Sequence, residues 1–196
     1  MTLLILNYLG IFVFAISGAL VAGRKHMDIF GFVVLALMPA IGGGTLRDLI
    51  LDVPVFWIVD HNYLYLTLAA ALLTFLLYRP LARISRVLSW FDAVGLSVFC
   101  VLGTAKALSI TGSATIAVMM GVVTAVAGGI VRDTVANDVP LVLRQEVYAT
   151  AAFIGAVAFV SLQTLGIPFA QWLAIAAALA VRGLGIAKGL SLPRAA

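Results

Sequence analysis

At residues 42–48 the chain reads GGGTLRD, and at residues 127–133 it reads AGGIVRD. The second stretch follows the first by 85 positions, and the same offset aligns three more pairs: Gly10 with Gly95, Phe14 with Phe99 and Tyr63 with Tyr148. Each copy contains three long apolar runs. Because three is an odd number, the second copy must enter a membrane from the opposite face. The sequence therefore predicts an inverted-topology repeat, an arrangement common in proteins that move solutes across bilayers.

The composition places the chain in lipid. Of its 196 residues, 64% are hydrophobic and 10% are charged, and the mean hydropathy is +1.19. A soluble domain has roughly a quarter of its residues charged. The apolar excess runs along the whole chain, so we expect a single membrane domain over 1–196 with the lipid bilayer as its partner.

The net charge of +4 does not indicate nucleic-acid binding. The basic residues sit in short loops between apolar runs, and the sequence has neither a basic stripe nor an aromatic platform on which bases would stack. Nucleic acid is excluded as a partner, and no soluble protein partner is inferred.

The apolar runs predict an all-α membrane protein with seven transmembrane helices. Repeat one covers about 3–80, repeat two about 88–166, and a seventh helix covers about 168–188. The expected spans are Leu3–Ala22, Ile29–Leu51, Leu64–Tyr78, Phe91–Leu108, Ala114–Ala136, Val147–Leu165 and Phe169–Ala187. The third is short for the ~30 Å hydrocarbon core unless it begins near Tyr63.

The loop charges predict the orientation. In a seven-span topology most basic residues fall on one face: Arg24, Lys25, Arg79, Arg83, Arg86, Arg144 and Lys188. Positive loops stay in the cytoplasm, so we expect the N-terminus outside and the C-terminus inside a prokaryotic plasma membrane.

The glycine runs are the first candidate site. Gly42, Gly43 and Gly44 follow Pro39, and Gly128 and Gly129 occupy the matching place in repeat two. Glycine and proline both weaken a helix, so the pattern predicts a kink or an unwound stretch beside a solute path. Such a break would present carbonyl groups at Gly42 to a cation and a half-helix N-terminus near Thr45 to a carboxylate. Close helix packing is the alternative use of the glycines.

Charged residues inside the spans are the second candidate site. Arg47 and Asp48 recur as Arg132 and Asp133, and they form either pore-mouth electrostatics or helix-end anchors that snorkel to head groups. In the first case we expect crossed pairs, Arg47 with Asp133 and Arg132 with Asp48. Asp92 would attract cations at the cytoplasmic side and Lys106 would oppose them at the other, unless both only mark helix ends. Arg182 is expected to snorkel.

Enzymatic chemistry is not predicted. The sequence has no nucleophile paired with a base and no cluster of metal ligands, and its one cysteine, Cys100, lies inside an apolar run. We expect no catalytic residue, no cofactor and no fixed metal.

The paired glycine and Arg-Asp motifs, together with the lone seventh helix, resemble prokaryotic trimeric intracellular cation (TRIC) channels. The same sequence unit is labelled a glycine-transporter-type domain in bacterial relatives. The resemblance implies a homotrimer with a pore in each protomer, lined by the second and fifth spans. It also implies passage of K⁺ or Na⁺, potassium above all. The lysine-containing motif with which animal relatives bind phosphoinositide has no equivalent near Gly128 and Gly129.

Two functions remain open at this point. One is a potassium-permeable channel, and the other is a secondary transporter of glycine or another small zwitterion.

Overall fold

Seven long helices follow the apolar runs in the residues that this computed structural model describes, which are 2–84, 86–144 and 147–191. The long helices are α1 (Thr2–Arg24), α2 (Ile29–Ile50), α4 (Asn62–Ala82), α5 (Val87–Thr111), α6 (Ala114–Val135), α7 (Ala149–Thr164) and α8 (Ala170–Lys188). Two short helices, α3 (Phe56–Val59) and η1 (Leu141–Leu143), lie in the connections that follow α2 and α6. Each predicted span corresponds to one long helix, and the predicted all-α fold is confirmed.

Six of the long helices are long and apolar enough to cross a membrane. The seventh, α7, is apolar but has 16 residues, which gives it a length of about 24 Å. The third span begins at Asn62, two residues earlier than predicted, and its 21 residues remove the expected shortfall.

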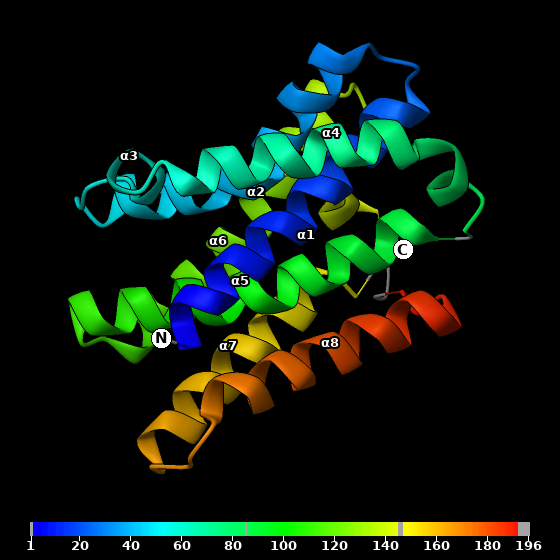
Figure 1. Cartoon of the computed structure of the whole chain (residues 1–196). Coiled ribbons are helices and arrows are strands. Elements are labelled where there is room, and N and C mark those ends of the chain that lie inside the picture. The colour runs from blue at the N-terminus through cyan, green and yellow to red at the C-terminus, as the bar shows by residue number, and fades with distance from the viewer. Residues whose placement is uncertain (1, 85, 145–146, 192–196) are drawn as a thin grey trace.

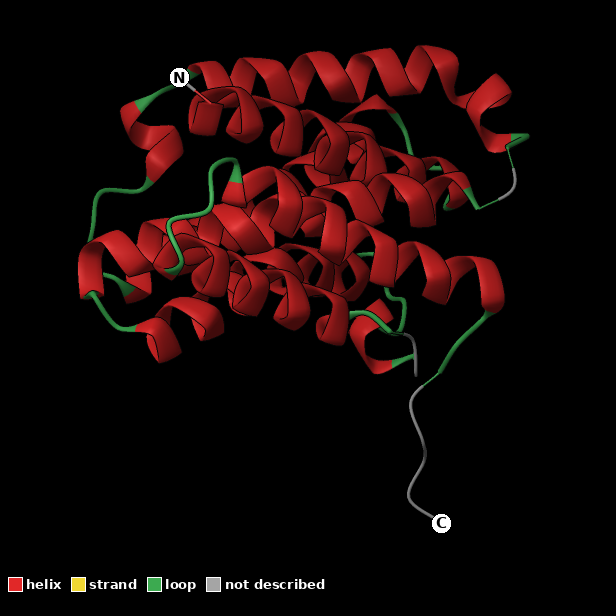
Figure 2. Cartoon of the chain, turned by 90° about the horizontal axis from the view of Figure 1, so that it is seen from below, coloured by secondary structure: helices red, strands yellow, loops and turns green. Residues whose placement is uncertain are grey.

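The helices pack as two similar halves joined along their centre. Helix α1 packs against α2 and α4, and α5 makes the same contacts with α6 and α7. The halves meet where α1 packs against α5 and α2 against α6, while α4 and α8 lie at opposite edges of the bundle (Figure 1). Helix α8 packs only on the second half, against α5 and α7, among the stronger contacts. Seen from below, the helices lie side by side and most of the loops gather at two ends (Figure 2).

The centre of the molecule uses residues of the sequence repeat. Phe14 of α1 stacks on Phe99 of α5, with ring centroids 5.2 Å apart. A Cβ on Gly95 would lie 2.1 Å from the Phe14 ring, and one on Gly10 would lie 3.1 Å from the Phe99 ring. Each glycine therefore makes room for the phenylalanine of the other half, which explains why both pairs recur together.

The helix ends also repeat. Asp28 caps α2 by accepting a hydrogen bond from the Gly31 N–H at 2.8 Å, and Ser113, 85 positions later, accepts one from Ile116 at 3.4 Å before α6. Such caps satisfy backbone donors that a helix start leaves free. The two helices thus begin at equivalent residues.

Candidate functional site

The glycine motifs lie where α2 crosses α6. A Cβ on Gly43 would lie 2.0 Å from the Thr124 carbonyl oxygen, and one on Gly128 would lie 2.7 Å from the Pro39 carbonyl oxygen. The contacts are reciprocal, because Gly43 and Gly128 are equivalent, as are Pro39 and Thr124. The missing side chains bring the two backbones into direct contact.

The predicted unwound stretch at these glycines is therefore wrong. Helix α2 is continuous from Ile29 to Ile50 through Pro39 and Gly42–Gly44, and α6 is continuous from Ala114 to Val135 through Gly128 and Gly129. Packing between small residues compensates the low helix propensity of glycine in a membrane. The alternative use of the glycines, close packing, is the one observed.

The half-helix termini expected from a break are consequently absent from these two described helices. Thr45 lies inside α2, where its hydroxyl donates to the Ile41 carbonyl at 2.7 Å and accepts from Trp57 Nε1 at 2.8 Å. Gly44 faces the ring of Phe56, and Gly129 faces the hydroxyl of Tyr148. Neither Thr45 nor Gly42 marks a helix terminus.

The first charged cluster consists of Arg47, Asp48 and Lys106. Asp48 Oδ1 accepts hydrogen bonds from Arg47 Nε at 2.8 Å and from Lys106 Nζ of α5 at 2.7 Å. Its Oδ2 accepts one from the Phe56 N–H at 2.9 Å. Both Arg47 and Asp48 are buried. Two cations therefore contact the Asp48 carboxylate, and each of its oxygens accepts at least one hydrogen bond.

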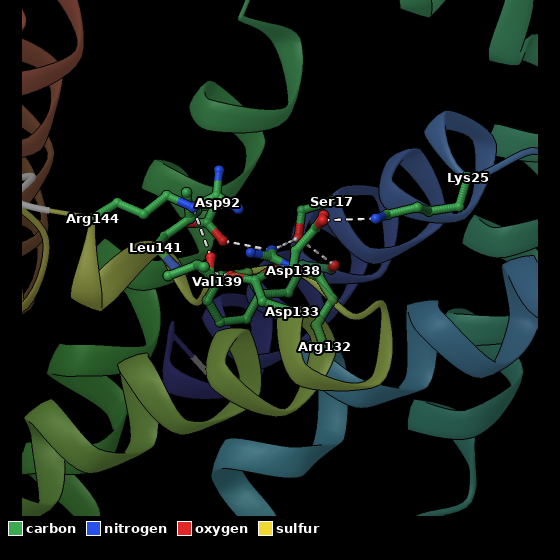
Figure 3. Close-up of polar contacts among 10 residues, drawn as sticks. Ser17, Lys25, Asp92, Arg132, Asp133, Asp138, Val139, Leu141 and Arg144 are labelled. Atoms are coloured by element: carbon green, nitrogen blue, oxygen red, sulfur yellow. Dashed lines mark hydrogen bonds and ion pairs between the residues drawn. The ribbon is translucent and has the colours of Figure 1, made fainter.

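The second charged cluster consists of Arg132, Asp133, Asp92 and Ser17 (Figure 3). Arg132 Nε donates to Asp133 Oδ1 at 2.7 Å, and its Nη1 donates to Asp92 Oδ1 at 2.7 Å and to Ser17 Oγ at 3.1 Å. Asp133 Oδ2 accepts from the Leu141 N–H at 3.0 Å. Arg132 and Asp92 are fully buried. This arginine thus joins α6 to α5 and α1.

The two clusters share one local geometry. In each, an arginine pairs with the next residue, and the aspartate also receives an N–H from a short helix that follows eight residues later. The chain turns there through a left-handed residue, Asp52 with φ 52° or Asn137 with φ 54°. The loop after each helix therefore folds back over the Arg-Asp pair.

The predicted crossed pairs are wrong. Arg47 does not meet Asp133 and Arg132 does not meet Asp48, because each Nε reaches the neighbouring carboxylate. Snorkelling is also ruled out, since Arg47 and Arg132 are 4% and 0% exposed and Arg182 is 0% exposed. Arg182 lies with its Cζ 4.9 Å from the centre of the Tyr148 ring. Asp92 and Lys106, whose role was left open, both form ion pairs.

The clusters lie at opposite ends of the bundle. Lys106 contacts the first and Asp92 the second, and these two residues are 14 positions apart on α5, which corresponds to about 21 Å. Equivalent motifs at opposite ends are what an inverted repeat requires. Several basic segments gather at the end with Asp92: Lys25 pairs with Asp138 at 2.6 Å, and Arg86 donates to the Ile186 carbonyl.

Three site residues were missed by the sequence analysis. Ser17 is a polar residue within an apolar run, Phe56 covers Gly44 and lies near Arg47, and Tyr148 lies over Arg182. The sequence repeat could have pointed to Tyr148, because Tyr63 is its equivalent in the first copy. It could not have pointed to Phe56, because the equivalent residue is Leu141.

A carboxylate in the loop after α3, Asp60, has hydrogen-bond partners of its own. Asp60 Oδ2 accepts a hydrogen bond from the Tyr8 hydroxyl at 3.0 Å, which ties the loop after α3 to α1. The Asn62 backbone N–H lowers the pKa of the Asp60 carboxyl below its usual value, and the Tyr8 hydroxyl adds to the effect.

Comparisons with known proteins agree with this architecture. A family model described as "Glycine transporter" matches residues 4–79 and again 89–164, two ranges offset by 85 positions. The inner membrane protein YadS of Escherichia coli is 42% identical over 193 residues, covering 96% of this chain and 93% of YadS. A UPF0126 membrane protein of Vibrio cholerae is 50% identical over 157 residues, but only 66% of its length is covered.

Solved structures are similar over almost the whole chain. A TRIC trimeric intracellular cation channel orthologue from Rhodobacter sphaeroides is 44% identical with a TM-score of 0.92, covering 96% of this chain and 99% of that one. A prokaryotic TRIC channel is 31% identical with a TM-score of 0.91, covering 98% and 99%. The predicted resemblance is confirmed, and the chain shares its fold with proteins described as cation channels.

Proposed function

The chain belongs to the glycine transporter family, whose model covers both repeats, and on this premise we propose that it is a channel for monovalent cations, including potassium. A pore lies inside each protomer of a homotrimer, in a prokaryotic plasma membrane. The N-terminus is outside and the C-terminus in the cytoplasm. Residues 1–196 form one membrane domain, and K⁺ or Na⁺ permeates without a cofactor or a fixed metal site.

One observation carries the proposal: the match over 96% of the chain, with a TM-score of 0.92, to a protein described as a cation channel orthologue. Because function resides in sites placed on a fold, the proposal also needs a route and suitable electrostatics.

The proposed route follows the crossing of α2 and α6. At Gly43 and Gly128 only backbone lies between the helices, and the facing groups are the carbonyls of Thr124 and Pro39. A gap between the helices at these glycines would be bordered by backbone atoms, so we place the constriction at this crossing.

The charged clusters give the route two unlike ends. In the second cluster two carboxylates contact one arginine, whereas in the first cluster two cations contact one carboxylate. Asp48 is saturated and does not itself attract cations. Of the two clusters, the one with Asp92 and Asp133 is the better place for a cation, because its two carboxylates outnumber its one arginine and local charge concentrates ions of opposite sign.

Electrical recording tests the proposal. Purified protein in a planar bilayer should show discrete unitary currents in symmetric potassium chloride. Gly43→Leu combined with Gly128→Leu should reduce these currents strongly, because the new side chains lie at the constriction. The control, Gly42→Ala, should conduct normally, because a Cβ there would meet only Gly128 Cα at 3.8 Å. Absence of unitary currents from correctly folded wild-type protein would overturn the channel.

A secondary transporter of glycine or another small zwitterion is the second candidate. It is favoured by the description of the family model and by the positive charge of the first cluster, which suits a carboxylate. A transporter would take labelled glycine into liposomes with saturation and without unitary currents.

A further inference from the structure

A cavity of about 310 Å³ opens beside the first charged cluster. Five helices line it with polar or aromatic groups: Asn7 of α1, Arg47 of α2, Phe56 of α3, Tyr63 of α4, and Lys106 and Ser109 of α5. A water molecule takes about 30 Å³ in the liquid, so the cavity has room for a small solute with some of its hydration.

The charges at this cavity do not balance. Arg47 and Lys106 share a single carboxylate, Asp48, whose oxygens already accept three hydrogen bonds. Arg47 is 4% exposed. Asp48 offsets one of the two positive charges, so a negative group beside Arg47 and the partly exposed Lys106 would be stabilised by the remaining positive charge.

The second repeat shows which group supplies the further hydrogen-bond acceptor of the equivalent arginine, Arg132. Arg132 uses Nε for Asp133 and Nη1 for Asp92, at 2.7 Å each. The residue equivalent to Asp92 in the first repeat is Asn7, which is neutral and bonds to the Leu3 carbonyl.

Arg47 therefore lacks a second carboxylate. In the described part of the chain its hydrogen bond is made through Nε, and a guanidinium has five N–H donors in a rigid fork that matches a carboxylate. Lys106 adds a cation to the first cluster, and its equivalent in the first repeat, Val21, adds none to the second.

We propose that this cavity binds a small carboxylate, which takes at Arg47 the place that Asp92 takes at Arg132. Lys106 supplies the second positive charge, and the Asn7 amide and the Ser109 hydroxyl are polar groups at the same wall. The site does not depend on whether the chain conducts cations, because it follows from the comparison of the two repeats.

Thermal unfolding of the purified full chain in detergent tests the site. Acetate is the probe, and it replaces chloride at constant sodium concentration and pH 7. The unfolding midpoint should rise with acetate and reach a plateau, because a ligand that binds only the folded state stabilises it. Glycine should give a rise as well, since it has a carboxylate, whereas methylammonium chloride should give none.

Two variants locate the binding. Asn7→Asp supplies the carboxylate from within the chain and should abolish the acetate-dependent rise. Its control is Asn62→Asp, which adds the same charge at an exposed position and should keep the rise. Lys106→Met should weaken the apparent affinity for acetate at least tenfold, Lys106→Arg should preserve it, and Lys188→Met, exposed at the far end, should not change it.

The proposal fails if acetate gives no saturable rise in the wild type, or if methylammonium gives the same rise. It also fails if Asn7→Asp and Lys106→Met, both folded, respond to acetate as the wild type does.

Discussion

Gly43 of α2 lies against Thr124 of α6 so closely that a Cβ on the glycine would be 2.0 Å from the threonine carbonyl oxygen. Gly128 and Pro39 repeat the relationship with the helices exchanged. The crossing therefore has an approximate two-fold symmetry, and its closeness depends on two glycines for which the sequence offered both a helix break and close packing.

This contact predicts unequal effects at neighbouring glycines. Gly43→Ala should destabilise the protein by about 1–3 kcal/mol, as over-packed substitutions do. Gly42→Ala should be tolerated or stabilise by up to about 1 kcal/mol, because it improves helix propensity without a clash. Unfolding in mixed detergent would measure both. Equal effects of the two substitutions would contradict the crossing.

The buried pair of Arg132 and Asp92 predicts a large loss of stability when broken. Asp92→Asn should cost about 3–5 kcal/mol, because it leaves a buried guanidinium without one of its counter-charges. Asp138→Asn, which breaks the partly exposed pair with Lys25, should cost less than about 1 kcal/mol. The same unfolding assay compares the two, and a loss as small for Asp92→Asn as for Asp138→Asn would contradict the role of the pair.

The unlike ends of the route predict rectification. Cation current should be larger when ions enter from the end with Asp92 and Asp133 than from the end with Lys106. Lys106→Gln should raise the cation current that enters from the end with Lys106 a few-fold at low salt. The increase should be smaller at 1 M salt, because the Debye length is then about 3 Å. Bilayer recordings at both polarities measure this. Lys188→Gln serves as the control and should leave rectification unchanged.

The proposed orientation predicts which loops react from outside the cell. Cys100 is fully buried, so the wild type should not react with a membrane-impermeant maleimide. His61→Cys, in the exposed loop before α4, should be labelled in intact cells, and His26→Cys, in the exposed loop after α1, only after the membrane is opened. The reverse pattern would overturn the orientation, and labelling of both in intact cells would overturn the inverted topology.

The helices and their repetition could be predicted from the sequence. Apolar runs and an offset of 85 positions are local or linear properties of the chain, so they located the seven long helices of the described residues and singled out Arg47, Asp48, Arg132 and Asp133. The repeat also showed that Asn7 stands where the second copy has Asp92, but the consequence of this difference became clear only when the structure paired Asp92 with Arg132.

The contacts of these residues could not be predicted, because they depend on how the helices pack. Whether a glycine breaks a helix or admits another helix depends on the neighbour, and here Thr124 and Pro39 supply a backbone that fits. Whether Arg132 contacts lipid head groups or Asp92 depends on how α5 and α6 cross. Here the crossing brings Asp92 Oδ1 to 2.7 Å from Arg132 Nη1, with both side chains buried. Helix periodicity shows which residues share one face of a helix, but it does not show which face of a neighbouring helix they contact. The ion pairs of this protein depend on those contacts between helices.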